Sequence, residues 1–263
     1  MPSPTTAAPS VPSTSLTPVI IGGRLVGTLL VIAILLCLVS FAGQVVEGRV
    51  SSPVVHKMTK WIDVNSEGNL PTWYSTVLIA LAALLSYLAA RAPHPVGQTT
   101  RGQWYGLTLA MLFVAADEGA QIHEKINVLL KPLHGQETYY FAWVGPWSAL
   151  VVVLALLFGK FLRGLPFRHR YEILVAGAVY VGGALGVECI EAACFFREDG
   201  VDLRYEGIAT VQELLEMVGM TLFIHAVIGV LSEQGTIPLQ FHSDSVHQTA
   251  AESVACPKPI IAP

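Results

Sequence analysis

The chain has 263 residues, of which 53% are hydrophobic and only 13% charged, and its net charge at pH 7 is −4. Charged residues usually form about a quarter of a soluble domain. With a mean hydropathy of +0.57, this composition excludes a soluble enzyme and indicates an integral membrane protein. The negative net charge argues against a nucleic-acid partner. The four cysteines form no CxxC pair, which argues against a zinc ribbon, a redox dithiol or a disulfide scaffold.

A helix needs about 20 mostly apolar residues to cross the hydrocarbon core of a bilayer. Six stretches reach this length, some of them only if polar residues are admitted. We therefore predict an all-α integral membrane protein, a bundle of six transmembrane helices at roughly 19–42, 72–90, 103–129, 142–162, 171–196 and 209–231.

The two ends of the chain have the composition of disordered tails. Residues 1–18 are mainly Pro, Ser, Thr and Ala without a charge, and residues 233–263 are polar and then Pro-rich. The transmembrane domain is accordingly expected over residues 19–232. The first apolar run is too long for a signal peptide and has no basic residue before Arg24, so we interpret it as a retained span.

The charges of the short loops predict the orientation. The loops at 91–102 and 160–170 contain six basic residues and no acid, whereas the loop before the sixth span is acidic. Because basic short loops face the cytoplasm, we expect both termini to be cytoplasmic and the first, third and fifth loops to lie outside.

Acidic residues gather at one depth of the bundle. The third and fifth spans run outward with their acids in their second halves, and the sixth runs inward with its acids in its first half. A rise of 1.5 Å per residue then places them at one level in the outer half of the bilayer. The set comprises Asp117, Glu118, His123, Glu124, Glu188, Glu191, Glu213 and Glu216. An unpaired carboxylate in hydrocarbon costs several kcal/mol, so these groups are protonated, solvated or bound to cations.

Helical spacing divides this set. Asp117, Gln121 and Glu124 fall on one face of a continuous helix, while Glu118 and His123 point away from it. We therefore expect the four acids of the fifth and sixth spans to converge with Asp117 and Glu124. Glu118 and His123 would then flank the site or hold a neighbouring helix.

Carboxylates with a histidine suit Fe, Mn or Zn, so we expect a divalent metal. The Glu-x-x-His motifs typical of di-metal helix bundles are absent. In an alternative interpretation the third span ends near Glu118, the acids are wet, and the segment from His123 forms an interfacial helix.

The first outer loop resembles the opening of a calcium-binding loop. Asp63, Asn65 and Glu67 occupy its first, third and fifth positions, and a glycine follows, but the twelfth position is Tyr74 rather than a glutamate. Calcium binding therefore competes with a simple turn in which Asn69 caps the next helix. The loop leads directly into the second span, so it is also placed to fold over the acids as a lid.

Three segments together resemble a family of bacterial multipass membrane proteins without an assigned activity. They are DVNSEGNLPTW from residue 63, ADEGAQIHE from residue 116 and ELLEM from residue 213. The resemblance runs from the first loop to the sixth span and omits both tails. It implies an integral protein of the bacterial cell (inner) membrane, and it implies no chemistry. The histidine clusters of rhomboid, prenyl-protease, ceramidase and desaturase families are missing, since only His123 and His225 fall in predicted spans.

The sequence leaves three functions open. The first is a metal-dependent enzyme for a lipid or other apolar substrate, in which carboxylates hold one or two metal ions and a spare carboxylate is the general base. The second is a cation- or proton-coupled transporter or channel, in which the acids form a relay. The third is a non-catalytic subunit of a membrane complex. We favour the enzyme because the acids occupy only half of the bilayer depth, and His225 is the one polar step in the inner half.

Overall fold

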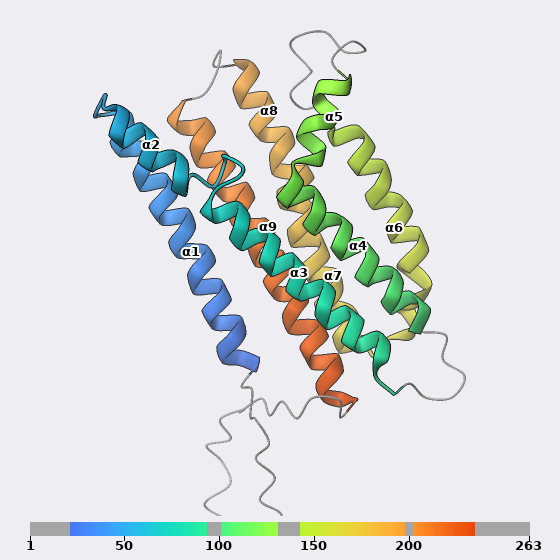
Figure 1. Ribbon diagram of the computed structural model, residues 1–263. Helices are drawn as coiled ribbons and strands as arrows, with labels where there is room; N and C mark the ends of the chain where they lie inside the picture. Colours follow the sequence, from blue (N-terminus) through green and yellow to red (C-terminus); the bar gives the residue numbers. More distant parts are fainter. Residues whose placement is uncertain (1–21, 94–100, 131–142, 198–201, 235–263) are drawn as a thin grey trace, which may run out of the picture.

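A computed structural model describes residues 22–93, 101–130, 143–197 and 202–234, and every regular element in these ranges is a helix (Figure 1). The helices lie side by side in one bundle. In chain order they are α1 (Gly22–Glu47), α2 (Pro53–Ile62), α3 (Leu70–Arg91), α4 (Arg101–Ala120), α5 (Ile122–Leu130), α6 (Val144–Gly164), α7 (Phe167–Val181), the π-helix η2 (Gly182–Val187), α8 (Glu188–Arg197) and α9 (Leu203–Glu233).

Five helices of the described chain are long and apolar enough to cross a membrane, which confirms a multipass membrane protein. They are Gly23–Glu47, Leu70–Arg91, Val144–Gly164, Phe167–Cys194 and Leu203–Glu233. These correspond to five of the six predicted spans. The third falls on α4, which packs along α3 but carries Asp117 and Glu118 within a more polar helix.

α9 is the central helix of the bundle, and α1, α3 and α7 pack around it. Two thirds (67%) of its most apolar stretch is buried, against 6% in α6. Ile224, Val227 and Leu231 of α9 are completely buried. A helix that is apolar all round is stable only inside a core or in lipid, so α9 belongs to the protein core and α6 faces the bilayer.

The prediction of one continuous helix over 103–129 was wrong. α4 ends at Ala120, Gln121 takes a left-handed backbone conformation with φ 57°, and α5 starts at Ile122. The Asp117 carboxylate accepts a hydrogen bond from the His123 backbone N–H (2.8 Å) and so caps α5. The alternative in which the third span ends near Glu118 is closer to the structure.

Within the fifth predicted span, the helix widens to a π-helix at Gly182–Val187. A Cβ added at Gly183 would lie 3.0 Å from both the Gln212 carbonyl oxygen and the Leu215 Cβ. The glycine therefore permits close contact between η2 and α9, which brings the acids of α8 and α9 to one place.

The chain between the first two spans contains α2, a short amphipathic helix that the sequence pattern did not predict. The two predicted tails lie outside the described residues, except for Glu233, the last residue of α9, and Gln234, which follows it.

Candidate metal centre

One cavity collects the acidic set that the sequence singled out. Its volume is about 230 Å³, and Asp117, Glu118, His123, Glu124, Glu188, Glu191, Glu213 and Glu216 all line it. The cavity also has an apolar wall, formed by Phe113, Val114, Leu150, Val151, Leu154, Val181, Ala184 and Leu185. The site is thus a chamber with one acidic and one apolar side, contributed mainly by α4, α5, α6, η2, α8 and α9.

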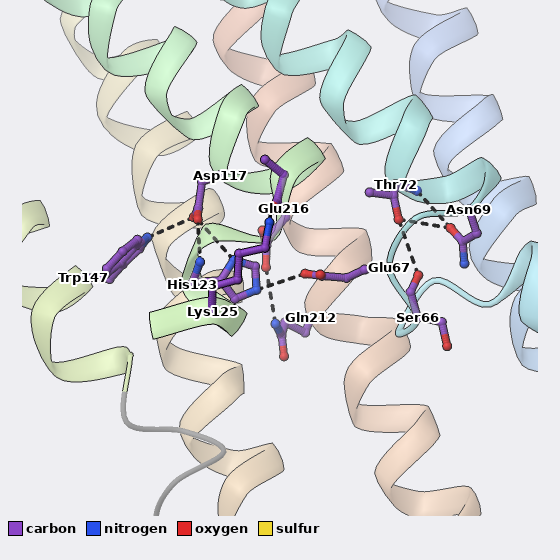
Figure 2. A network of polar contacts seen from close by, with 11 residues as sticks. Ser66, Glu67, Asn69, Thr72, Asp117, His123, Lys125, Trp147, Gln212 and Glu216 are labelled. Atoms are coloured by element: carbon purple, nitrogen blue, oxygen red, sulfur yellow. Dashed lines mark hydrogen bonds and ion pairs between the residues drawn. The ribbon is translucent and has the colours of Figure 1, made fainter. Parts of the chain in front are cut away.

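Three residues on this chamber are close enough to share one metal ion. Glu67, His123 and Glu124 each offer a ligand atom, and these atoms lie within 4.8 Å of one another. In the part of the chain that the structure describes, no other three acidic, histidine or cysteine residues meet in this way. Figure 2 shows Glu67 extending from the loop after α2 towards His123, and its Oε1 lies 3.1 Å from His123 Nε2.

His123 is oriented by a buried carboxylate on its other side. Its Nδ1 lies 3.4 Å from Asp117 Oδ1, and the Trp147 indole N–H donates to Asp117 Oδ2 at 3.0 Å (Figure 2). A carboxylate at Nδ1 favours the tautomer that carries its proton there, which leaves the Nε2 lone pair for a metal. The Trp143 ring lies beside the imidazole at an angle of 50°, with ring centres 5.0 Å apart.

The electrostatics of α5 follow from this arrangement. Burial disfavours the charged form of His123, but its hydrogen bonds with Asp117 and Glu67 outweigh burial and raise its pKa to about 10. Burial raises the pKa of Glu124, and the nearby Glu67 charge adds to the effect. The two carboxylates that contact His123, from Asp117 and Glu67, thus favour its charged form.

The hydrogen bonds of the calcium-like loop form a turn and cap the helix that follows it. Asp63 closes a turn, since its Oδ1 accepts from the Asn65 backbone N–H (3.1 Å) and its Oδ2 from the Ser66 hydroxyl (2.5 Å). Asn69 caps α3 by accepting from the Thr72 backbone N–H at 3.2 Å (Figure 2). Asn65 and Glu67 line the chamber, whereas Asp63 does not. Calcium binding by Asp63, Asn65 and Glu67 stays a prediction.

The remaining predicted acids lie along the chamber but outside the group of three. Glu188 and Glu191 are buried on α8, at 8% and 3% exposure. Gln212 donates to Glu216 at 3.4 Å on α9 (Figure 2). Glu118 and Glu216 also border a second, small void.

Sequence reasoning missed two features of this centre. It placed His123 at the edge of the site, because it assumed an unbroken helix through Gln121. It assigned Glu67 to a calcium loop, although the same loop was expected to be able to cover the acids. The signal available in the sequence was the position of that loop, directly before the second span.

A family model described as a domain of unknown function (DUF8692) matches residues 28–231. The chain belongs to this family. The match begins within α1 and ends within α9, so the DUF8692 region includes all three candidate metal ligands. No curated protein and no solved structure matches the chain. The DUF8692 description assigns no activity, so function is argued from the site. Bacterial origin and location in the cell membrane stay predictions.

Proposed function

We propose that this protein is a membrane enzyme that binds one divalent metal ion through Glu67, His123 and Glu124 and acts on a lipid or other apolar molecule. The observation that carries the proposal is the approach of these three ligand atoms to within 4.8 Å of one another beside a half-apolar chamber. Intramembrane acidic residues are costly, and they are retained mainly where they have a function.

The donor set supports a transition metal. One imidazole nitrogen and two carboxylates suit Zn, Fe or Mn, and three protein ligands leave a coordination position for water or substrate. Asp117 behind His123 gives the carboxylate–histidine pair that orients metal-binding imidazoles. A metal of this kind, when bound, activates water and polarises carbonyl or phosphoryl oxygens.

The rest of the chamber provides the other parts that such an enzyme needs. Glu188 and Glu191 are not in the ligand group and provide a carboxylate for proton transfer. The chamber is smaller than the roughly 300–1,000 Å³ of pockets that enclose whole ligands. It therefore holds the reacting segment of a long substrate, whose remainder stays in the bilayer.

The orientation proposed from the basic loops places this chamber in the outer half of the membrane. In Figure 1 the start of α1 and the end of α9 lie at the same end of the bundle, and α5, the helix of His123 and Glu124, lies towards the other end. Two ends on one side need an even number of crossings, which supports α4 as a sixth crossing beside the five apolar helices.

The metal content of the purified protein tests the proposal. Protein prepared in detergent without chelator is expected to carry about one Zn, Fe or Mn per chain by mass spectrometry. Glu67→Gln and Glu124→Gln each remove a ligand charge but keep the side-chain shape, and each is expected to lower the metal affinity at least tenfold. Glu233→Gln is the matched control, because it removes a carboxylate that also pairs with a histidine (His169 Nε2, 2.8 Å) but lies at the end of α9 and not among the three candidate ligands.

The proposal fails if the wild type contains no stoichiometric metal and if added Zn, Fe or Mn leaves its melting temperature unchanged.

A second assay separates enzyme from transporter. Membrane lipid extracts incubated with wild type and with Glu124→Gln are compared by mass spectrometry, and metal flux is followed in proteoliposomes. A lipid product formed only by the wild type supports the enzyme, whereas flux without a product supports the transporter.

A further inference from the structure

α2 presents an unpartnered apolar face at one end of the bundle. Its Thr59 and Ile62 pack on α1, where a Cβ added at Gly43 would lie 3.4 Å from both side chains. The adjoining face carries Val54, Met58 and Trp61, which are 66%, 65% and 65% exposed. α2 follows a candidate span and precedes another. A short helix with an apolar face and a tryptophan at the end of two spans lies in the lipid headgroup region.

An open groove runs between α2 and the metal centre. Its volume is about 780 Å³. Two of the three candidate metal ligands line the groove as well as the chamber, so groove and chamber meet at the metal centre. The lining residues that matter here are His56, Lys57, Lys60 and Trp61 on α2, and Glu67 and Glu124 opposite them.

The two lysines give the α2 side of the groove its charge. His56 is already paired with Glu47, at 2.5 Å. Lys60 donates to the Ser66 hydroxyl at 3.2 Å, which holds its ammonium beside the loop that carries Glu67. Lys57 is exposed and has no carboxylate partner among the described residues. Two ammonium groups thus border the same groove as two metal-binding carboxylates.

We propose that this groove binds the phosphate of an anionic lipid headgroup, with Lys57 and Lys60 contacting the phosphate and the apolar face of α2 contacting the acyl chains. The proposal rests on the proposed function, because it identifies anionic phospholipids as the substrate class of the metal centre. The apolar face of α2 favours a lipid over a soluble phosphate, since acyl chains can pack against this face and a free anion cannot. A bound divalent metal cancels the two negative charges of Glu67 and Glu124, so a phosphate in the groove then meets the two lysines without an opposing negative charge.

Lipid binding by the full chain in neutral detergent tests the proposal. Phosphatidylglycerol, phosphatidylcholine with the same acyl chains, and inorganic phosphate are titrated separately, and binding is measured by native mass spectrometry and by the shift in melting temperature. Each basic residue near an anionic membrane surface contributes about fivefold in affinity. Lys57→Gln with Lys60→Gln is therefore expected to weaken phosphatidylglycerol binding by about 25-fold. Lys57→Arg with Lys60→Arg keeps both positive charges and is expected to bind phosphatidylglycerol as well as the wild type does.

The matched control is Lys160→Gln with Arg163→Gln, which removes two exposed charges at the far end of α6. This pair is expected to keep the selectivity for phosphatidylglycerol. The proposal is overturned if phosphatidylcholine or inorganic phosphate binds as well as phosphatidylglycerol. It is also overturned if the control pair loses as much affinity as the groove pair.

The titration is repeated with EDTA and with added metal to separate the two proposals. Selective lipid binding that depends on the two lysines, in a protein that takes up no metal, would leave the groove standing and refute the metal enzyme. Stoichiometric metal in a protein without lipid selectivity would refute only the groove.

Discussion

The hydrogen bonds of Asp117 allow the cost of one substitution to be worked out. The carboxylate is 8% exposed and accepts from the His123 backbone and from the Trp147 indole, and its Oδ1 also faces His123 Nδ1. In Asp117→Asn, the amide oxygen can keep the contacts with His123, but the new NH₂ group then faces the Trp147 N–H. A buried donor left without an acceptor costs about 1–3 kcal/mol. Bonds to a charged acceptor are about twice as strong as neutral ones.

We therefore expect Asp117→Asn to destabilise the metal-free protein by about 2–4 kcal/mol. Metal affinity should also fall by about 10–100-fold, because His123 loses the partner that orients it. The matched control is Asp202→Asn. Asp202 caps α9 by accepting from the Tyr205 backbone N–H at 2.8 Å, and asparagine caps helices as well as aspartate.

Melting in detergent and metal titration, measured on both variants, form the assay. Asp202→Asn should stay close to wild type in both measurements. If Asp117→Asn melts within a degree of Asp202→Asn and binds metal equally well, then the Asp117–His123–Trp147 arrangement does not stabilise the site, and the reasoning is refuted.

Four further predictions concern the backbone, the proton and the topology. Gly219→Ala should destabilise the bundle by about 1–3 kcal/mol or more, because the added Cβ would lie 2.5 Å from the Tyr180 backbone nitrogen. Gly177→Ala is the control and should be tolerated, because no atom lies within 4 Å of its added Cβ. Equal melting temperatures of the two variants would contradict this packing. The pKa of His123 is raised from 6.5 to about 10, so a metal that binds this imidazole at neutral pH displaces one proton. The apparent metal affinity should therefore rise about tenfold per pH unit between about pH 7 and 9. A metal affinity that does not change with pH would exclude His123 as a ligand. Gln121→Gly should raise the melting temperature, since a φ of 57° favours glycine by about 1 kcal/mol. A lower melting temperature than that of the wild type would show that the Gln121 side chain stabilises the break between α4 and α5. A cysteine introduced at Ser66 should react with an impermeant reagent on intact cells, and protection from it would reverse the proposed orientation.

The amino-acid sequence was sufficient for the class of protein, and it singled out the acids that line the chamber. Apolar length and low charge predicted the five apolar helices, because a membrane span is defined by the local cost of burying polar groups. The same cost made acids such as Glu188 and Glu216 conspicuous. Their common depth followed from helix rise and alternating direction, and the structure places them on one chamber.

The tertiary structure alone decided which side chains meet. The left-handed residue Gln121 turns α5 away from the axis of α4, so the angles calculated for a continuous helix do not apply to His123. A non-glycine residue with positive φ leaves no pattern in the sequence, because surrounding contacts hold it there. Glu67 contacts His123 although α3 and α4 separate the two residues in the chain. Periodicity describes neighbours along one helix, and it carries no information about a contact between segments so far apart in the chain.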